Sequence, residues 1–357
     1  MLYKQNWDAV KKRYLEYWAL ENHDRPLLAI KSPKARPSDS APPLKEHASQ
    51  KERWFDTRYL LERVNHQFEN TFFGAEALPT YFPNLGPDIF AAFYGVDLEF
   101  GENTSWSKYH DLDFDVYSGL KLNRQNQYYQ KMLEMTKATV EDGRDKYLVG
   151  VTDLHPGADA LVSMRGPQQL CFDAVERPED IQRAVMELFD GFKTTYDELY
   201  QLTTKYQQGS TNWMGVWHPE RWYVSSCDFA ALISNDMFKE LIMEELLAEL
   251  DFLDASIFHL DGPDALRHLD TLLSIDRLKG IQWVYGAGNP TAAHWIDILK
   301  RIQSAGKMIH IDVVPDDLDL LLEQLKPEGV LYTMHVSSQE QAEAQIKKVN
   351  QYKKKFY

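Results

Sequence analysis

The stretch Phe258-His259-Leu260-Asp261-Gly262 closes a short apolar segment that we predict to be a β-strand. The residues before it have the pattern of a helix that leads into this strand, and the glycine, followed by a proline, ends it. Because side chains alternate along a strand, His259 and Asp261 face the same side. A helix that leads into a short apolar strand with polar residues at its C-terminal end is typical of α/β proteins.

A second apolar segment, residues 329–334, ends at His335. In a parallel sheet or barrel the C-terminal ends of strands converge, so we expect His335 to approach His259 and Asp261. Two imidazoles and one carboxylate leave an open coordination position and suit zinc or ferrous iron. We therefore predict a divalent metal on these three residues, with zinc first and iron or manganese as alternatives. The competing interpretation is that the side chains satisfy backbone groups or pair with one another.

Composition bounds the class of protein. A chain of 357 residues, 44% hydrophobic and 13% aromatic, can bury a large core as one α/β barrel with additions. The net charge of −15 repels phosphate backbones and anionic lipids, so we expect neither nucleic acid nor a membrane as partner. Because the sequence has no apolar run of ~18–20 residues and no signal peptide, we predict a cytoplasmic protein. The two cysteines, Cys171 and Cys227, lack metal-binding spacing.

Two parts of the chain differ in pattern. Residues 1–140 combine predicted helices, including 7–18 and 45–70, with loops and the first part of a barrel. Residues 145–350 alternate short apolar strands with helices, which indicates βα units and a parallel sheet. We predict one (β/α)8 barrel domain over residues 1–357, with N-terminal helical additions. The strands expected in the second part are 147–151, 212–217, the segment before His259, 280–284, 307–312 and the segment before His335.

Three segments carry a family resemblance: Ser226-Cys227-Asp228-Phe229 with Ile233-Ser234, His259-Leu260-Asp261-Gly262, and Gly280-Ile281-Gln282-Trp283-Val284. They resemble the uroporphyrinogen decarboxylase superfamily, and more closely its branch of cobalamin-dependent methyltransferases. The resemblance implies a (β/α)8 barrel. Methyltransferases of this branch carry His-x-Cys-Gly after one strand and a further Cys after the last strand, which bind the zinc that activates a thiol. His259, Asp261 and His335 fall on these three positions.

Two departures from the family pattern change the expected chemistry. Uroporphyrinogen decarboxylases open with Met-Arg-Gln-Ala-Gly-Arg, whereas this chain has the segment Ala-Ile-Lys-Ser-Pro at 29–33, so porphyrinogen decarboxylation is not expected. Asp261 and His335 replace the two thiolates, which hardens the ligand set and leaves more positive charge on the metal. Such a site favours polarising an oxygen group over presenting a soft thiolate.

Other strand ends carry candidate catalytic residues. Asp153 and His155 share the i, i+2 relation, and His310 and Asp312 repeat it. We predict that His310 and His155 carry protons, that Asp153 forms an acid/base pair with His155, and that Asp228 is a functional side chain in a loop after a strand. The alternatives are that Asp153 and His155 form an additional metal-ligand set, that Asp153 stabilises a local turn, and that Asp228 is a helix N-cap.

Aromatic side chains near strand ends can stack on a sugar, a flat heterocycle or the edge of a corrin. The competing interpretation is core or lid packing, which is usual for large aromatics. A guanidinium beside Gly-Pro would contact an anion or lie in a turn exposed to water. The predicted substrate-binding residues are Trp213, Trp217, Trp222, Trp283, Tyr285 and Arg165.

These features together predict an enzyme. The first prediction is metal-dependent transfer of a methyl or other one-carbon group to a metal-activated acceptor, with a corrinoid as external donor by the family resemblance. One alternative is a metal-assisted lyase or hydrolase that acts on a sugar or another polyhydroxylated substrate. A second is a barrel that binds a ligand without catalysis. The expected partners are a small-molecule substrate and, for methyl transfer, a corrinoid protein, and an oligomer is compatible with the sequence.

Overall fold

The protein is an α/β structure built on a seven-stranded, mostly parallel sheet. The computed structural model describes residues 1–38, 41–111 and 115–352. Neighbouring strands pair in the order β2-β1-β11-β10-β9-β8-β7, with β2 antiparallel to β1 and every other pair parallel. The strands of this sheet are β1 (Leu27–Pro33), β2 (Thr71–Ala75), β7 (Trp222–Ser226), β8 (Ala255–Asp261), β9 (Gly280–Val284), β10 (Met308–Asp312) and β11 (Val330–His335).

Four short strands form two further pairs. Strand β3 (Thr80–Tyr81) pairs in parallel with β6 (Leu148–Val149), and β4 (Leu98–Phe100) pairs antiparallel with β5 (Ser105–Ser107). In the described part of the chain, strand pairing does not run unbroken from β7 back to β2. The structure therefore shows the predicted α/β class, and closure into a (β/α)8 barrel stays a prediction.

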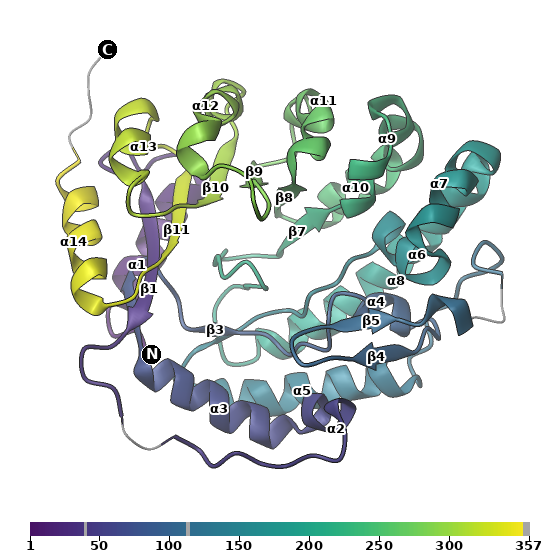
Figure 1. Ribbon diagram of the computed structural model, residues 1–357, viewed down its shortest axis with the longest axis horizontal. Coiled ribbons are helices and arrows are strands. Elements are labelled where there is room, and N and C mark those ends of the chain that lie inside the picture. The colour runs from purple at the N-terminus through teal and green to yellow at the C-terminus, as the bar shows by residue number, and fades with distance from the viewer. Residues whose placement is uncertain (39–40, 112–114, 353–357) are drawn as a thin grey trace.

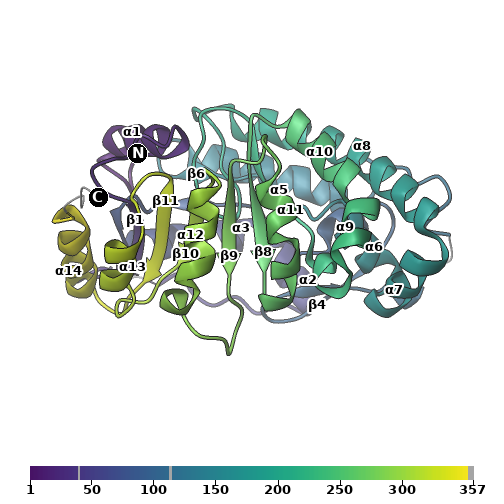
Figure 2. The ribbon, with the colours of Figure 1, turned by 90° about the horizontal axis from the view of Figure 1, so that it is seen from above.

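The helices of the C-terminal part of the chain cover the outer face of the sheet. In Figure 1, α9 to α14 form an arc outside strands β7 to β11, and α3 and α5 lie across the molecule from this arc. Figure 2, seen from above, shows α11, α12 and α13 over strands β8 to β11. Among the described residues, none of the helices is long and apolar enough to cross a lipid bilayer. The helices are α1 (Trp7–Trp18), α2 (Gln50–Phe55), α3 (Thr57–Asn70), α4 (Ile89–Ala92), α5 (Gln127–Gly143), α6 (Gly157–Arg165), α7 (Pro167–Glu176), α8 (Pro178–Thr203), α9 (Asn235–Leu241), α10 (Met243–Phe252), α11 (Leu269–Leu273), α12 (Ile296–Ser304), α13 (Leu318–Gln324) and α14 (Gln339–Asn350).

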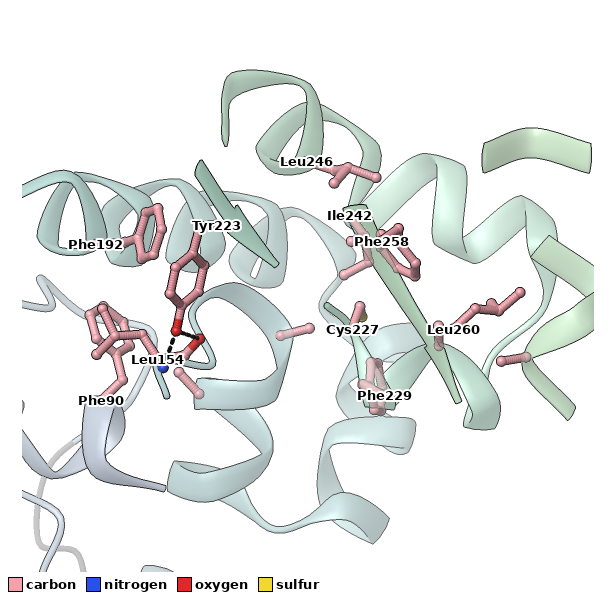
Figure 3. Packing of buried hydrophobic residues seen from close by; sticks show 14 of the residues in the cluster. Phe90, Leu154, Phe192, Tyr223, Cys227, Phe229, Ile242, Leu246, Phe258 and Leu260 are labelled. Atoms are coloured by element: carbon pink, nitrogen blue, oxygen red, sulfur yellow. Dashed lines mark hydrogen bonds between the residues drawn. The ribbon is translucent and has the colours of Figure 1, made fainter. Parts of the chain in front are cut away.

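Along each strand of the sheet, side chains point alternately toward the outer helices and toward the interior. Leu260, Trp283 and Ile311 are partners across β8, β9 and β10, and all three are buried in the large apolar cluster that includes residues of the outer helices. Figure 3 shows part of this cluster around Phe258 and Leu260. Full burial of each such side chain contributes about 1.5–3 kcal/mol, so the register of these strands is strongly specified. The neighbours of these residues along each strand therefore face the interior.

The strand predicted at 212–217 is wrong. Asn212 Oδ1 accepts a hydrogen bond from Met214 N at 3.1 Å, and Gly215 has a φ of +72°, a conformation that glycine adopts without strain. The chain therefore turns at this place, and the next strand, β7, begins only at Trp222.

The predicted N-terminal helices are present, with one break. The helix predicted at 7–18 is α1, whereas the single helix predicted at 45–70 consists of α2 and α3. The break lies at Asp56, whose carboxylate accepts from Tyr59 N and so caps the start of α3.

A buried ion pair ties the start of β1 to the segment that follows β2. Glu76 is 2% exposed and accepts from both terminal nitrogens of Arg25, at 3.0 and 2.7 Å. The same carboxylate accepts from Leu28 N at 2.9 Å. Removing one partner of a buried pair leaves an uncompensated charge, which is far costlier than losing an exposed pair.

We expect Glu76→Ala to lower the free energy of unfolding by about 3–5 kcal/mol, because the Arg25 guanidinium would stay buried without its partner. The matched control is Glu62→Ala on α3, where an exposed pair with Arg58 is lost and the change should stay below about 0.5 kcal/mol. Urea unfolding followed by circular dichroism measures both variants. Equal losses would show that the Glu76 pair does not stabilise the junction.

Candidate functional site

Polar side chains line the interior face of β8, β9 and β10 in one row. Gln282 on β9 is the register partner of His259 on one side and of His310 on the other. Partners in paired strands face the same way, so the three polar side chains point into the interior, opposite the apolar row that packs under the helices. This interior face at the C-terminal half of the strands is the candidate site.

An imidazole and two carboxylates converge at the end of β8. One ligand atom each from Asp228, His259 and Asp261 lies within 4.8 Å of the others. His259 Nδ1 donates to Gln282 Oε1 at 2.6 Å. Because an amide oxygen only accepts, this bond places the proton on Nδ1 and leaves the lone pair of Nε2 free. Nε2 lies 4.0 Å from Asp228 Oδ1, which is room for an ion between them.

The position of Asp228 depends on a carboxylate that is distant in sequence. Asp159 on α6 accepts from the backbone nitrogens of Asp228 and Phe229, both at 3.0 Å, at the start of the short 3₁₀ helix Asp228–Leu232. Burial and the nearby charge of Asp159 raise the pKa of Asp228 to about 6, although His155 and His259 oppose the shift. Asp159 therefore holds the backbone that aims Asp228 toward His259.

His155 is held between carboxylates. Its Nε2 lies 3.0 Å from Asp153 Oδ1, and its Nδ1 lies 3.6 Å from Asp159 Oδ2 and 3.3 Å from Ser226 Oγ. Burial alone would lower the pKa of His155, but the charges and hydrogen bonds of Asp153 and Asp159 outweigh it and raise this pKa well above its ordinary value. Although His155, Asp159 and Asp228 also lie within 4.8 Å of one another, both nitrogens of this ring already have partners. His155, Asp153 and Asp159 therefore form an ion-pair network rather than a set of metal ligands.

His335 does not join His259 and Asp261 in either of the described metal-competent groups. Leu331 is the β11 residue in the row of His259, Gln282 and His310, and His335 lies four residues further along its strand, ~13 Å at ~3.3 Å per residue. His335 is instead the register partner of Lys31 in the neighbouring strand β1. The metal on His259 and Asp261 stays a prediction, with Asp228 as the third residue that the structure brings to them.

His310 lies deep in the interior with no hydrogen-bond partner. It is 3% exposed, and neither ring nitrogen has a partner among the described residues. Burial lowers the pKa of His310 to about 4, against the opposing charge of Asp312. The ring is therefore neutral at pH 7 and lines a cavity of about 210 Å³. The proton-carrying role of His310 stays a prediction, which its free ring nitrogens and its place beside the cavity allow.

The predicted substrate-binding aromatics divide between the cavity and the core. Trp213 lines the 210 Å³ cavity, and its ring meets that of His259 edge-on at 5.3 Å. Trp217 and Trp222 are fully buried in the apolar cluster beneath α1, and Trp283 is buried on the helix side of β9. These three rings pack in the core, as the competing interpretation expects, and their role in substrate binding stays a prediction.

Two other predicted contacts lie away from the cavity centre. The hydroxyl of Tyr285 donates to Asp312 O at 3.4 Å, beside the C-terminal end of β10. Arg165 is paired with buried Asp173 at 2.6 Å, so its charge is already balanced within the protein. Arg165 borders a separate cavity of about 660 Å³.

The sequence analysis did not assign three residues to the site: Gln282, Asp159 and Lys31. Gln282 had a signal, since a polar residue inside an apolar strand implies an interior polar contact. Asp159 gave none, because its role depends on a contact with backbone 69 residues away. Lys31 was noted only for replacing an arginine motif, and the structure places it in the wall of the 210 Å³ cavity.

Comparison with known proteins identifies structures that share the fold, but it does not identify a family. No protein-family model matches the sequence, and no curated protein sequence matches it significantly. Solved structures do match: a methyltransferase from Methanosarcina mazei superposes with a TM-score of 0.62 and 11% identical residues, covering 95% of this chain and 97% of that chain. The two chains therefore share their fold over nearly their whole length.

Two buried carboxylates lie behind the site on α10. Glu249, 2% exposed, accepts from Ser225 Oγ at 3.0 Å, and Glu245 is 5% exposed. Burial raises the pKa of Glu249 to about 8, against the smaller opposing effect of its bond to Ser225. An acid whose pKa is raised in the folded state stabilises the fold fully below its ordinary pKa, here 4.5, and loses that contribution as the pH rises through the folded value.

We expect the stability of the wild-type protein to fall between about pH 4.5 and 8 by up to a few kcal/mol, and Glu249→Gln to flatten this dependence. Glutamine keeps an acceptor for Ser225 but carries no charge. The control is Glu244→Gln, an exposed position on the same helix, which should follow the wild type. The measurement is the melting temperature of each protein as a function of pH. Parallel curves for wild type and Glu249→Gln would contradict the raised pKa of Glu249.

Proposed function

We propose that this protein is a methyltransferase with a closed (β/α)8 barrel of the uroporphyrinogen decarboxylase superfamily, and that a divalent metal activates its methyl acceptor. The observation that carries the proposal is the convergence of Asp228, His259 and Asp261 at the C-terminal end of a strand, where barrel enzymes place their active sites. The shared fold with a methyltransferase and the family resemblance of the motifs support methyl transfer.

The residues present fit a metal. One imidazole and two carboxylates supply the nitrogen and oxygen donors that zinc, iron and manganese accept. Gln282 fixes the tautomer of His259 in the way that outer partners of metal-bound histidines do. When bound, such a metal would polarise an acceptor group and lower its pKa.

The protein's own groups handle orientation and the proton. Asp159 holds the backbone of Asp228, and the paired, protonated His155 keeps the surrounding carboxylates partly neutralised. In the net reaction a methyl group replaces a proton on the acceptor. Neutral His310, next to Gln282 in the interior row, is the base that accepts this proton at a ring nitrogen. By the family resemblance, the donor is a methylated corrinoid carried by a partner protein, and the corrinoid keeps the electron pair of the cobalt–carbon bond that breaks.

A second candidate function follows from the hardness of the ligand set. The group within 4.8 Å contains two carboxylates and no thiolate. Cys227, near the site, is buried, and burial raises the pKa of its thiol well above the ordinary value. Hard ligands favour oxygen groups, so a metal-assisted lyase or hydrolase of a polyhydroxylated substrate is the alternative.

We expect purified wild-type protein to hold about one equivalent of a divalent metal by inductively coupled plasma mass spectrometry, and His259→Ala and Asp228→Asn to lose most of it. His335→Ala is the matched control, because the structure places His335 outside the group. Loss of metal in His335→Ala with retention in Asp228→Asn would favour the ligand set predicted from sequence. No metal in reconstituted wild type would contradict both sets.

For activity, we expect metal-loaded wild type to consume methylcobalamin in the presence of at least one small alcohol, thiol or organic acid, as followed by its absorbance spectrum. His310→Gln should lower kcat by roughly 10²-fold or more, as loss of a general base does, with unchanged metal content. Turnover of glycosides or polyols without demethylation of methylcobalamin would replace methyl transfer by the second candidate function.

A further inference from the structure

The 210 Å³ cavity lies on the side of the interior that faces β10, β11 and β1. It is lined by Lys31, His310, Asp312, Thr333 and His335, and by apolar groups. Gln282 and Trp213, which both contact His259, form part of the same wall. The cavity therefore adjoins the proposed metal group without including it. Its volume corresponds to roughly seven water molecules at ~30 Å³ each, which suits a molecule of a few carbon atoms.

Lys31 brings an uncompensated positive charge to this cavity. Its Nζ has neither an ion-pair nor a hydrogen-bond partner among the described residues, and its one described contact is with the ring of Phe73, whose centroid lies 5.9 Å away. Burial lowers the pKa of Lys31, with no carboxylate opposing the shift. The half-buried Lys31 is paired with no carboxylate of the described residues, so its positive charge is available to an anion that enters from outside.

Other buried lysines of this chain show what a structural lysine looks like here. Lys4 Nζ donates to Phe73 O and Ala75 O at 2.8 and 2.7 Å. Lys307 Nζ donates to Ile275 O and Leu278 O at 2.6 and 2.7 Å. Backbone carbonyls thus satisfy the ammonium groups that pack in the core. Lys31 departs from this pattern.

The remaining polar groups of the cavity are suited to receive an anion. His310 is 3% exposed, and both ring nitrogens lack partners, so one N–H is free to donate into the cavity. The single carboxylate, Asp312, lies at the exposed rim, where it accepts from Thr333 Oγ1. No ion pair joins it to Lys31 within the described part of the chain. The charge of Lys31 is therefore left for a ligand.

We propose that this cavity binds a small organic acid, with the carboxylate of the acid paired to Lys31 Nζ and its other end beside His310. The opposite end of the acid then points along Gln282 and Trp213 toward His259. The proposal rests on the proposed function in one respect, since it makes this acid the methyl acceptor. Binding of the carboxylate itself depends only on the cavity.

The experiment is isothermal titration calorimetry on the metal-depleted, full-length protein with propionate, butyrate and benzoate, each beside its neutral amide. We expect at least one acid to bind and its amide to bind at least about tenfold more weakly. Lys31→Met should weaken binding of the acid by roughly 10- to 100-fold, the loss of one charge-assisted hydrogen bond. The matched control is Lys326→Met, at an exposed lysine away from the cavity, which should bind as wild type does.

A thermal measurement keeps the test independent of folding defects in the variant. Without ligand, Lys31→Met should melt at or above the wild-type temperature, because it removes a partly buried, unpaired charge. The acid should raise the melting temperature of wild type and not that of Lys31→Met. The proposal is overturned if no acid binds below about 10 mM, if amide and acid bind equally, or if Lys31→Met binds as wild type. Since no metal is present, failure of methyl transfer would leave these results standing.

Discussion

Parallel pairing of β8, β9 and β10 places His259, Gln282 and His310 in one interior row and Leu260, Trp283 and Ile311 in one outer row. The outer row is buried under the helices, so a slip of one residue would drive imidazoles into the apolar core and large apolar groups into the interior. Burying those three side chains stabilises the fold by several kcal/mol. The packing of the core therefore also fixes the register of the polar row. No further interaction is therefore needed to align the central residues of the site.

Polar groups in the interior differ in whether the protein satisfies them. His155 has carboxylates or a hydroxyl at both nitrogens, and Asp159 uses both oxygens on backbone amides. His310 and the Lys31 ammonium have no such partners in the described structure. Unsatisfied buried polar groups cost stability, and proteins concentrate them where a ligand completes them. The protein thus satisfies the groups around His155 with its own side chains and backbone, whereas it provides no such partners for His310 and Lys31 among the described residues.

The sequence predicts most of the second half of the fold, because short apolar segments between helices identify β8, β9, β10 and β11 directly. The error at residues 212–217 has a local cause, since Trp213, Val216 and Trp217 imitate a strand while Gly215 turns the chain. Strand β7 was missed because its apolar part is only three residues long, Trp222 to Val224, and ends at Ser225.

The site was predictable only where it depends on one strand. Alternation gives His259 and Asp261 a common face, whereas the third member depends on contacts across the fold. Asp228 is brought to them by its backbone bond to Asp159, and His335 is carried away by the register between β10 and β11. Neither contact leaves a pattern in the sequence, because each joins residues far apart in the chain.

The dimensions of the interior constrain any reaction at this site. A cavity of about 210 Å³ is far too small for a tetrapyrrole, so a corrinoid donor has to approach the carboxylates at the strand ends from outside. The small acid proposed as the acceptor would instead occupy the cavity, between Lys31 and the row of His259, Gln282 and His310. In the proposed reaction the two substrates then meet at the end of β8 from opposite directions. This arrangement lets the interior exclude water from the acceptor while the donor stays bound to its own carrier.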